Sequence, residues 1–296
     1  MALELAPHEP QPTPITRETI YQEMTPFERW MFGLAHTDPK RAVEVLREWV
    51  EMCPAYDGPA DLSDVLPPGA PIPDFPAYWF TPVHFQPGAH TNPRIPRLVY
   101  LARTRFTFTR EEQIREHLAR IHAGRALRRV LDIGTGTGTT AFAFAELWPE
   151  AEVIGIDLSA PYIRFARQWA ADRGVRNVQF YLQNAQRTVF PDASFDVVHF
   201  TYVLHEMPAA DARAILAEMF RLIRPGGALS AMEVLYDDTE EARAARAARG
   251  AAGPEPFLPE YMALDLERAI AAAGFRNVTR HAAYEDGMVI TAERPE

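Results

Sequence analysis

The fold of this 296-residue chain is decided by one stretch, Arg129-Val130-Leu131-Asp132-Ile133-Gly134-Thr135-Gly136-Thr137-Gly138-Thr139-Thr140. Its first half is the short apolar run that is typical of a strand covered on both faces in a parallel sheet. The three glycines at alternate positions let the backbone turn tightly and approach a ligand closely. Residues 141–147 then predict a helix that ends before Pro149, and its N-terminus favours a negative ligand group. The stretch therefore predicts a strand, a ligand-binding turn and a helix.

The spacing of these glycines separates two classes of nucleotide site. A dinucleotide fingerprint requires glycine at its first, third and sixth positions, but the sixth position counted from Gly134 is Thr139. Gly134-x-Gly136-x-Gly138, with Asp132 two residues before the first glycine, instead resembles motif I of the class I S-adenosylmethionine-dependent methyltransferases. The resemblance implies S-adenosylmethionine as the cofactor and places Asp132 opposite its methionine amino group. The alternative is that Asp132 is an ordinary polar residue at a strand end.

The rest of the chain follows the pattern of a doubly wound α/β fold. Apolar runs predict strands at 129–133, 152–157, 178–182, 195–200, 228–235, 275–284 and 288–292. Helices are predicted over 160–173, 211–223 and 258–273, whereas 236–256 fits either a short exposed helix or a mobile lid. The terminal pair of strands, joined by a short turn, predicts an antiparallel C-terminal hairpin. The fold class that this resembles is the seven-stranded, Rossmann-like methyltransferase sheet.

Two further motifs make the resemblance specific. The run from Val189 to Val198 matches the family's "lPFpDxSFDvV" pattern, and Leu222-Ile223-Arg224-Pro225-Gly226-Gly227 matches its "LkPGG" turn. Together they extend the resemblance over roughly residues 110–296. The nearest group includes the ubiquinone- and menaquinone-pathway methyltransferases and many natural-product enzymes. These elements mostly specify the fold, so they do not name the methyl acceptor.

The sequence predicts three regions: a mobile tail at 1–15, an N-terminal cap at 16–108 and a catalytic domain at 109–296 that contains the glycine loop. Within the cap, the proline density of 53–96 excludes regular helix and permits only edge strands. The same segment is rich in aromatic residues, unlike a disordered linker, so we expect an ordered, irregular segment that covers something; the alternative is a loop that only stabilises the core. Helices are predicted over 16–35, 38–50 and 109–124, and a helix or extended piece over 97–108.

Composition narrows the function classes. The net charge of −10 argues against a nucleic-acid substrate, whose phosphates call for a basic face. The single cysteine, Cys53, excludes a disulfide framework and favours a cytoplasmic setting, and the first fifteen residues lack the pattern of a secretory signal. No apolar run approaches the length of a membrane span. No cluster of residues has metal-ligand spacing, and the sequence does not indicate an oligomeric state.

The resemblance carries a cofactor site over to named positions. Asp157 ends the second strand, where a carboxylate can accept hydrogen bonds from both ribose hydroxyls; the alternative is a helix cap. Asn184 follows the third strand at the position that contacts the adenine amino group, and its side-chain carbonyl can accept that bond; the alternative is a turn residue. The remaining predicted cofactor-binding residues are Gly134, Thr135, Gly136, Gly138, Leu158, Ala185 and Thr201.

The reacting side of the crevice is predicted after the fourth strand. The ends of such strands face the ligand, which makes Tyr202 and His205 the first candidates. His205 could take a proton from the acceptor while Glu206 orients it; the alternative is that His205 has a structural role. His199 lies mid-strand and is predicted to be a core residue, whereas His90, in the cap, is either a pocket residue or an exposed loop residue.

The sequence thus predicts transfer of a methyl group from S-adenosylmethionine to a small, apolar or aromatic acceptor through an O, N or C nucleophile. The residues after the fourth strand do not match the motif of nucleic-acid amino-methylating enzymes. Two alternatives stay open: a catalytically silent S-adenosylmethionine-binding or scaffold protein, and another reaction of the same cofactor on the same fold.

Overall fold

The computed structural model describes residues 61–81, 83, 89–93, 95–102, 118–234, 239–251, 255–281 and 287–296, together with six isolated positions before residue 45. The expected tail at 1–15 lies outside these residues, as does most of each helix expected at 16–35, 38–50 and 109–124. Within them, no helix is long and apolar enough to cross a membrane.

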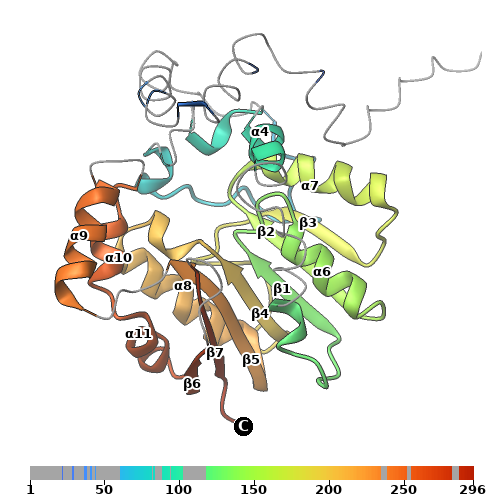
Figure 1. Ribbon diagram of the computed structural model, residues 1–296. Coiled ribbons are helices and arrows are strands. Elements are labelled where there is room, and N and C mark those ends of the chain that lie inside the picture. The colour runs from blue at the N-terminus through green and yellow to red at the C-terminus, as the bar shows by residue number, and fades with distance from the viewer. Residues whose placement is uncertain are drawn as a thin grey trace, which may run out of the picture.

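The core of the molecule is one seven-stranded sheet, as predicted (Figure 1). Its spatial order is β3-β2-β1-β4-β5-β7-β6; six strands are parallel, and β7 runs antiparallel to its neighbours β5 and β6. The chain passes outward from β1 to β3 and then returns to β4, beside β1. This reversal is the switch point at which open α/β sheets bind ligands. The strands are β1 (Arg129–Ile133), β2 (Glu152–Asp157), β3 (Val178–Leu182), β4 (Phe195–Thr201), β5 (Ile223–Val234), β6 (Arg276–Arg280) and β7 (Gly287–Glu293).

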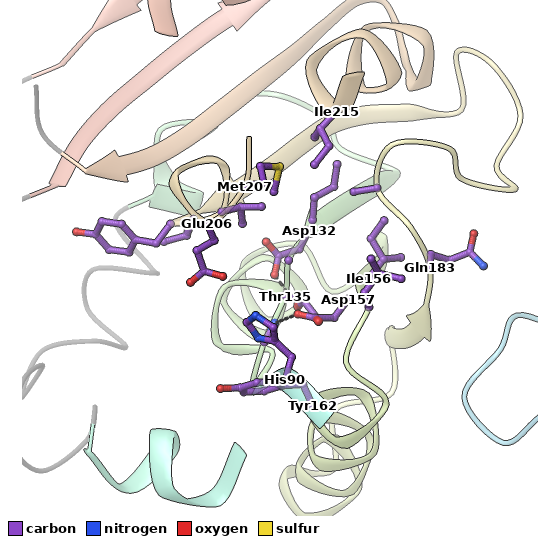
Figure 2. A pocket seen from close by; sticks show the side chains of 18 of the residues that line it. His90, Asp132, Thr135, Ile156, Asp157, Tyr162, Gln183, Glu206, Met207 and Ile215 are labelled. Atoms are coloured by element: carbon purple, nitrogen blue, oxygen red, sulfur yellow. Dashed lines mark hydrogen bonds between the residues drawn. The ribbon is translucent and has the colours of Figure 1, made fainter. Parts of the chain in front are cut away.

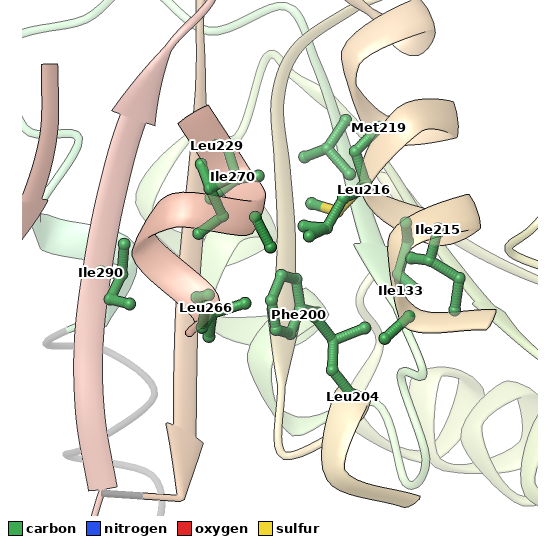
Figure 3. Close-up of a cluster of buried hydrophobic side chains, with 14 of the residues drawn as sticks. Ile133, Phe200, Leu204, Ile215, Leu216, Met219, Leu229, Leu266, Ile270 and Ile290 are labelled. Carbon is green, nitrogen blue, oxygen red and sulfur yellow. The ribbon is translucent and has the colours of Figure 1, made fainter. Parts of the chain in front are cut away.

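Helices cover both faces of the sheet because its central strands carry apolar residues on both sides. On one face, Val130 and Val153 pack with α6 (Thr139–Leu147) and α7 (Ala160–Arg173). On the other, Leu131 and Ile133 pack with α8 (Ala209–Leu222), α10 (Leu258–Met262) and α11 (Leu266–Ala272). Figure 3 shows the second cluster, in which Phe200 lies among side chains of α8 and α11. The two layers fix the ends of β1, β2 and β4 relative to one another.

The C-terminal third differs from the sequence-based boundaries at three places. The expected helix at 258–273 is two helices, because Asp265 adopts φ +51° and its side chain accepts a hydrogen bond from Arg268 N, at 3.1 Å, which starts α11. The Arg224–Gly227 turn is continuous with β5, which begins at Ile223 and not at residue 228. β6 ends at Arg280, earlier than expected. The segment that was predicted as a helix or a lid contains a helix, α9 (Glu240–Ala251).

The described part of the proline-rich segment is ordered and irregular, as expected. It contains the short helices η1 (Ala77–Phe80) and η2 (Ala89–Thr91) and continues into α4 (Ile95–Ala102), which lies beside α7 (Figure 1). Backbone contacts hold it to the sheet: Leu182 N donates to Val65 O at 2.8 Å. Ser159 Oγ donates to the carbonyl of His90. The segment therefore lies over the ends of the strands.

Candidate functional site

A pocket opens at the carboxyl ends of β1, β2 and β4, under the proline-rich segment (Figure 2). It is built from three sources: the glycine loop, the residues that follow β2, β3 and β4, and the cap. Of the ten predicted cofactor-binding residues, the nine that line it are Asp132, Gly134, Thr135, Gly136, Asp157, Leu158, Asn184, Ala185 and Thr201. Sequence reasoning therefore located the pocket, and the individual roles of these residues stay predictions.

The glycine loop needs glycine for conformation and for space. Gly134 and Gly136 have φ of +62° and +52°, in the left-handed region that other residues avoid. A Cβ on Gly134 would lie 2.5 Å from Val203 Cγ2. Gly138 is the tenth predicted cofactor residue, but it does not line the pocket. It starts α6 at φ +88°, where a Cβ would lie 2.8 Å from the Phe180 ring, so the structure assigns it a packing role.

Asp132 is nearly fully buried at the end of β1. Its Oδ2 accepts a hydrogen bond from Thr135 Oγ1 at 2.7 Å, which ties the strand to the glycine loop. Figure 2 shows its carboxylate directed into the pocket. The negative charge of this carboxylate would stabilise a cationic ligand group next to it.

Asp157, at the end of β2, hydrogen-bonds to the same glycine loop. Its Oδ2 accepts from Gly136 N at 3.0 Å and its Oδ1 from Ser159 N at 2.8 Å. Burial raises the pKa of Asp157 to about 6, although these backbone hydrogen bonds act in the opposite direction. Each oxygen keeps a further lone pair for a ligand. Both expected roles, ligand contact and local capping, are therefore compatible with the position of this side chain.

Asn184 joins the site to the cap. Its Nδ2 donates to Asp74 O at 3.0 Å, and its Oδ1 accepts from Gln186 N at 2.9 Å. The amide is thus fixed by backbone groups on both sides of the pocket. A second lone pair on Oδ1 can accept a hydrogen bond from a ligand.

The three predicted catalytic residues separate into two groups. Tyr202 and Glu206 line the pocket, and the Glu206 carboxylate points into it (Figure 2). His205 is buried and does not line the pocket; its Nδ1 lies 2.8 Å from Glu233 Oε2. The expected pairing of His205 with Glu206 stays a prediction, and the hydrogen-bond partner that the structure shows for His205 is Glu233. The sequence concealed this pairing because Glu233 belongs to β5, the neighbouring strand.

The Glu233 carboxylate organises the turn after β4. Its Oε1 accepts from Val203 N and Leu204 N, at 2.6 and 2.7 Å, and its Oε2 accepts from Val234 N at 3.0 Å. Burial opposes the charged imidazolium, but the charge and hydrogen bond of Glu233 outweigh it, and Glu206 and Glu255 add to them, so the pKa of His205 is raised. The pair holds the η4 turn (Leu204–Glu206), from which Glu206 reaches the pocket.

The cap contributes aromatic side chains to the pocket, of which sequence reasoning had named only His90, as one of two alternatives. Tyr78, Trp79 and His90 line the pocket, and the Trp79 and His90 rings stack with centroids 4.4 Å apart at an interplanar angle of 17°. Burial, with the charges of Asp211 and Glu206, raises the pKa of the Tyr78 phenol far above its usual range, so it stays protonated. Tyr162 and Gln183 also line the pocket without having been expected. The signal for Tyr78 and Trp79 was the aromatic content of a proline-rich segment.

The charge of the pocket is negative. Asp132, Asp157 and Glu206 line it, and no lysine or arginine does so among the residues that the structure describes. That part of the chain also contains no group of three metal-ligating side chains. An acidic, partly enclosed pocket with a bare glycine backbone suits a nucleoside that carries positive charge, because a cation relieves the mutual repulsion of the carboxylates.

Comparison with known proteins agrees with this geometry. A "Methyltransferase domain" family model matches residues 130–227. A demethylmenaquinone methyltransferase of Deinococcus radiodurans is 33% identical over 179 residues, covering 54% of this chain and 72% of that protein. One from Thermus thermophilus is 38% identical over 109 residues, covering 37% of this chain and 48% of that protein.

Solved structures show the same fold. An O-methyltransferase family protein from Burkholderia thailandensis superposes with a TM-score of 0.53 at 20% sequence identity, and the match covers 69% of this chain and 61% of that one. The chain spans about half the length of several curated relatives that it matches.

Proposed function

The chain belongs to the class I S-adenosylmethionine-dependent methyltransferases, and from this premise we propose that it transfers a methyl group from S-adenosylmethionine to a small, aromatic acceptor. The observation that carries the proposal is the convergence of the glycine loop, Asp132, Asp157 and Asn184 on one acidic pocket. The backbone and carboxylates there offer acceptors for an ammonium group and two hydroxyls, with no side chain on the loop to exclude the nucleoside.

We assign each part of the cofactor to the residues that suit its chemistry. Asp132 faces the methionine ammonium group, and Asp157 accepts from the ribose hydroxyls. Asn184 Oδ1 accepts from the adenine amino group, with Leu158 and Ala185 against the ring. These placements follow the family pattern and match the acceptor chemistry of the three side chains.

The chemistry asks little of the protein beyond orientation. S-adenosylmethionine supplies an electrophilic methyl carbon: the acceptor's nucleophile bonds to it while the carbon–sulfur bond breaks and its electron pair stays on sulfur. Tyr202 and the cap aromatics hold the acceptor in line and exclude water. Glu206 takes the proton that the nucleophile releases, because it is the carboxylate on the turn after β4 that reaches the pocket. His205 supports this turn through Glu233.

An aromatic acceptor suits the side of the pocket that the cap forms. Tyr78, Trp79 and Tyr202 present rings there, and rings prefer to pack against other rings in offset or edge-on geometry. The acidic lining disfavours an anionic acceptor. Two curated relatives are named for the methylation of demethylmenaquinone, itself aromatic, which supports a neutral phenol or quinol-like acceptor for this chain.

The test is calorimetric titration of the whole chain with S-adenosylmethionine and S-adenosylhomocysteine, followed by incubation with a panel of phenols, amines and quinols. We expect saturable binding of both ligands and a product heavier by one methylene group. Binding without turnover of any acceptor would favour the silent scaffold, and a product with a different mass gain would favour another reaction of the same cofactor. Absence of binding at millimolar ligand would overturn the proposal.

Three wider features belong to the same proposal. We infer a cap formed by residues 16–108 over a catalytic domain at 109–296, supported by the described contacts of residues 61–102 with the strand ends. A cytoplasmic location is supported by the single cysteine, Cys53. The net charge of −10 and the acidic pocket argue against a nucleic-acid partner.

A further inference from the structure

A network of buried, hydrogen-bonded polar side chains leads from the pocket into the core. His199 Nε2 lies 2.7 Å from Thr201 Oγ1, and His199 Nδ1 lies 2.8 Å from Ser230 Oγ. Ser230 Oγ lies 2.8 Å from His122 Nε2. His199 and Ser230 have no exposed surface, whereas Thr201 lines the pocket. This network therefore ends at one hydroxyl, that of Thr201, which a ligand in the pocket can reach.

The sheet itself builds this arrangement. Asp132, His199 and Ser230 are cross-strand neighbours on β1, β4 and β5, so their side chains stand in a row on one face. The ring of Phe144, from α6, covers the row: its centroid is 5.8 Å from that of His199 and 5.9 Å from that of His122. Buried polar groups are costly unless they are hydrogen-bonded, so breaking one of these hydrogen bonds would lower the stability of the fold.

Proton counting couples the three hydrogen bonds, so that the direction of one sets the direction of the other two. A neutral imidazole has one N–H, so His199 donates through one nitrogen and accepts through the other, and the single proton of Ser230 goes to only one of its two histidine neighbours. Burial lowers the pKa of His122 to about 4, which leaves its ring neutral and able to accept at Nε2. When Thr201 donates to His199 Nε2, the other bonds follow: His199 donates to Ser230, and Ser230 donates to His122. The lone pairs of Thr201 then face the pocket.

We propose that His199 is a positioning residue for the cofactor, because it fixes the Thr201 hydroxyl as a hydrogen-bond acceptor beside Asp132 for the ammonium group of the methionine moiety. The inference rests on the proposed function, which places that moiety at the end of β1. An ammonium group only donates hydrogen bonds, so it needs the direction in which Thr201 presents lone pairs. With the opposite direction the Thr201 oxygen would accept a hydrogen bond from His199 and would keep one lone pair fewer for the ammonium group.

Two amide substitutions at His199 separate this role from packing. The amide of His199→Gln reaches the position of Nε2, next to Thr201, whereas that of His199→Asn reaches only the position of Nδ1, next to Ser230. Binding to the whole chain is measured by calorimetry with S-adenosylhomocysteine and with 5′-methylthioadenosine, which has the nucleoside but lacks the amino-acid end. We expect about a tenfold loss of S-adenosylhomocysteine affinity in His199→Asn, the scale of one hydrogen bond, and less than about a threefold loss in His199→Gln.

The controls make the result decisive. Affinity for 5′-methylthioadenosine should be the same in both variants, and the difference between them should vanish in a Thr201→Val background. Ser230→Ala, which removes one oxygen, serves if a His199 variant does not fold, and it should weaken S-adenosylhomocysteine binding without changing 5′-methylthioadenosine binding. Equal losses for both ligands would overturn the inference while leaving the proposed function intact, whereas absence of S-adenosylhomocysteine binding by the unmodified chain would refute the proposed function first.

Discussion

Replacing Asp157 with asparagine should stabilise the ligand-free protein at neutral pH while it abolishes cofactor binding. Burial raises the pKa of this carboxyl from its ordinary value of 3.8 to about 6. A rise of about 2 pKa units corresponds to about 3 kcal/mol of unfavourable ionisation. The Asp157→Asn side chain keeps one oxygen for the N–H of Gly136 or Ser159 but loses the other bond, at about 1 kcal/mol. A net gain of about 1–2 kcal/mol is therefore expected.

The sign of the pH dependence follows from the direction of this pKa change. The folded protein binds the proton more tightly than the unfolded chain does, so the protonated carboxyl favours folding below pH 3.8. That advantage is lost as the pH rises through about 6. The difference in unfolding free energy between Asp157→Asn and the unmodified chain should therefore grow as the pH rises from 3.8 to about 6, and should level off at higher pH. Urea denaturation measures it.

Ligand addition completes the test. A ligand at one hundred times its dissociation constant stabilises a folded protein by about 2.7 kcal/mol, and this increment should appear with S-adenosylhomocysteine in the unmodified chain but not in Asp157→Asn. The reasoning is refuted if the variant binds the ligand normally and is less stable at every pH. That result would show that Asp157 serves only to cap the turn before α7.

Three further predictions follow from the surroundings of single residues. Gly134→Ala should lower the unfolding free energy by about 2–3 kcal/mol more than Gly174→Ala in thermal denaturation, because both positions have positive φ but only the first would place a Cβ against Val203; equal losses would refute the steric argument. Glu206→Gln should reduce kcat about 100-fold in a variant that still binds the cofactor by calorimetry, and an unchanged kcat would remove it from the mechanism. His205→Ala should lower the unfolding free energy, measured by urea titration, by about 3 kcal/mol. Because the pKa of His205 is raised, this loss of stability should become smaller as the pH rises through that pKa; a constant difference would show that the histidine is neutral in the folded state.

The fold was predictable because its signals are local. The apolar run at β1, the glycine loop and the proline-glycine turn before the middle of β5 each occupy a few consecutive residues, and each has a backbone requirement that few other residues meet. The break between α10 and α11 was not predictable in this way. It depends on a non-glycine residue, Asp265, at positive φ, and an aspartate in an apolar helical pattern does not indicate that conformation.

Site residues that end or follow a strand were predictable from the sequence, whereas their hydrogen-bond partners on neighbouring strands were not. Asp132, Asp157 and Asn184 each follow or end a strand, so the rule that strand ends meet the ligand found them. The partners Glu233 and Ser230 were missed because they belong to β5, and only the register of the sheet brings them beside His205 and His199. A histidine in a strand has the same sequence signature whether it only packs in the core or also belongs to a network of hydrogen-bonded polar side chains.

The acidity of the pocket connects binding to turnover. Asp132, Asp157 and Glu206 lie together in one partly enclosed space, where the charge of Glu206 contributes to the raised pKa of Asp157. A sulfonium ligand relieves this repulsion, so part of its binding free energy comes from its charge. In the proposed mechanism, methyl transfer removes that charge and places a proton on Glu206, which lowers the negative charge of the lining at the same step. The electrostatic attraction therefore falls when the product forms, and S-adenosylhomocysteine should dissociate more readily above the pKa of the proton acceptor, where the repulsion among the carboxylates returns.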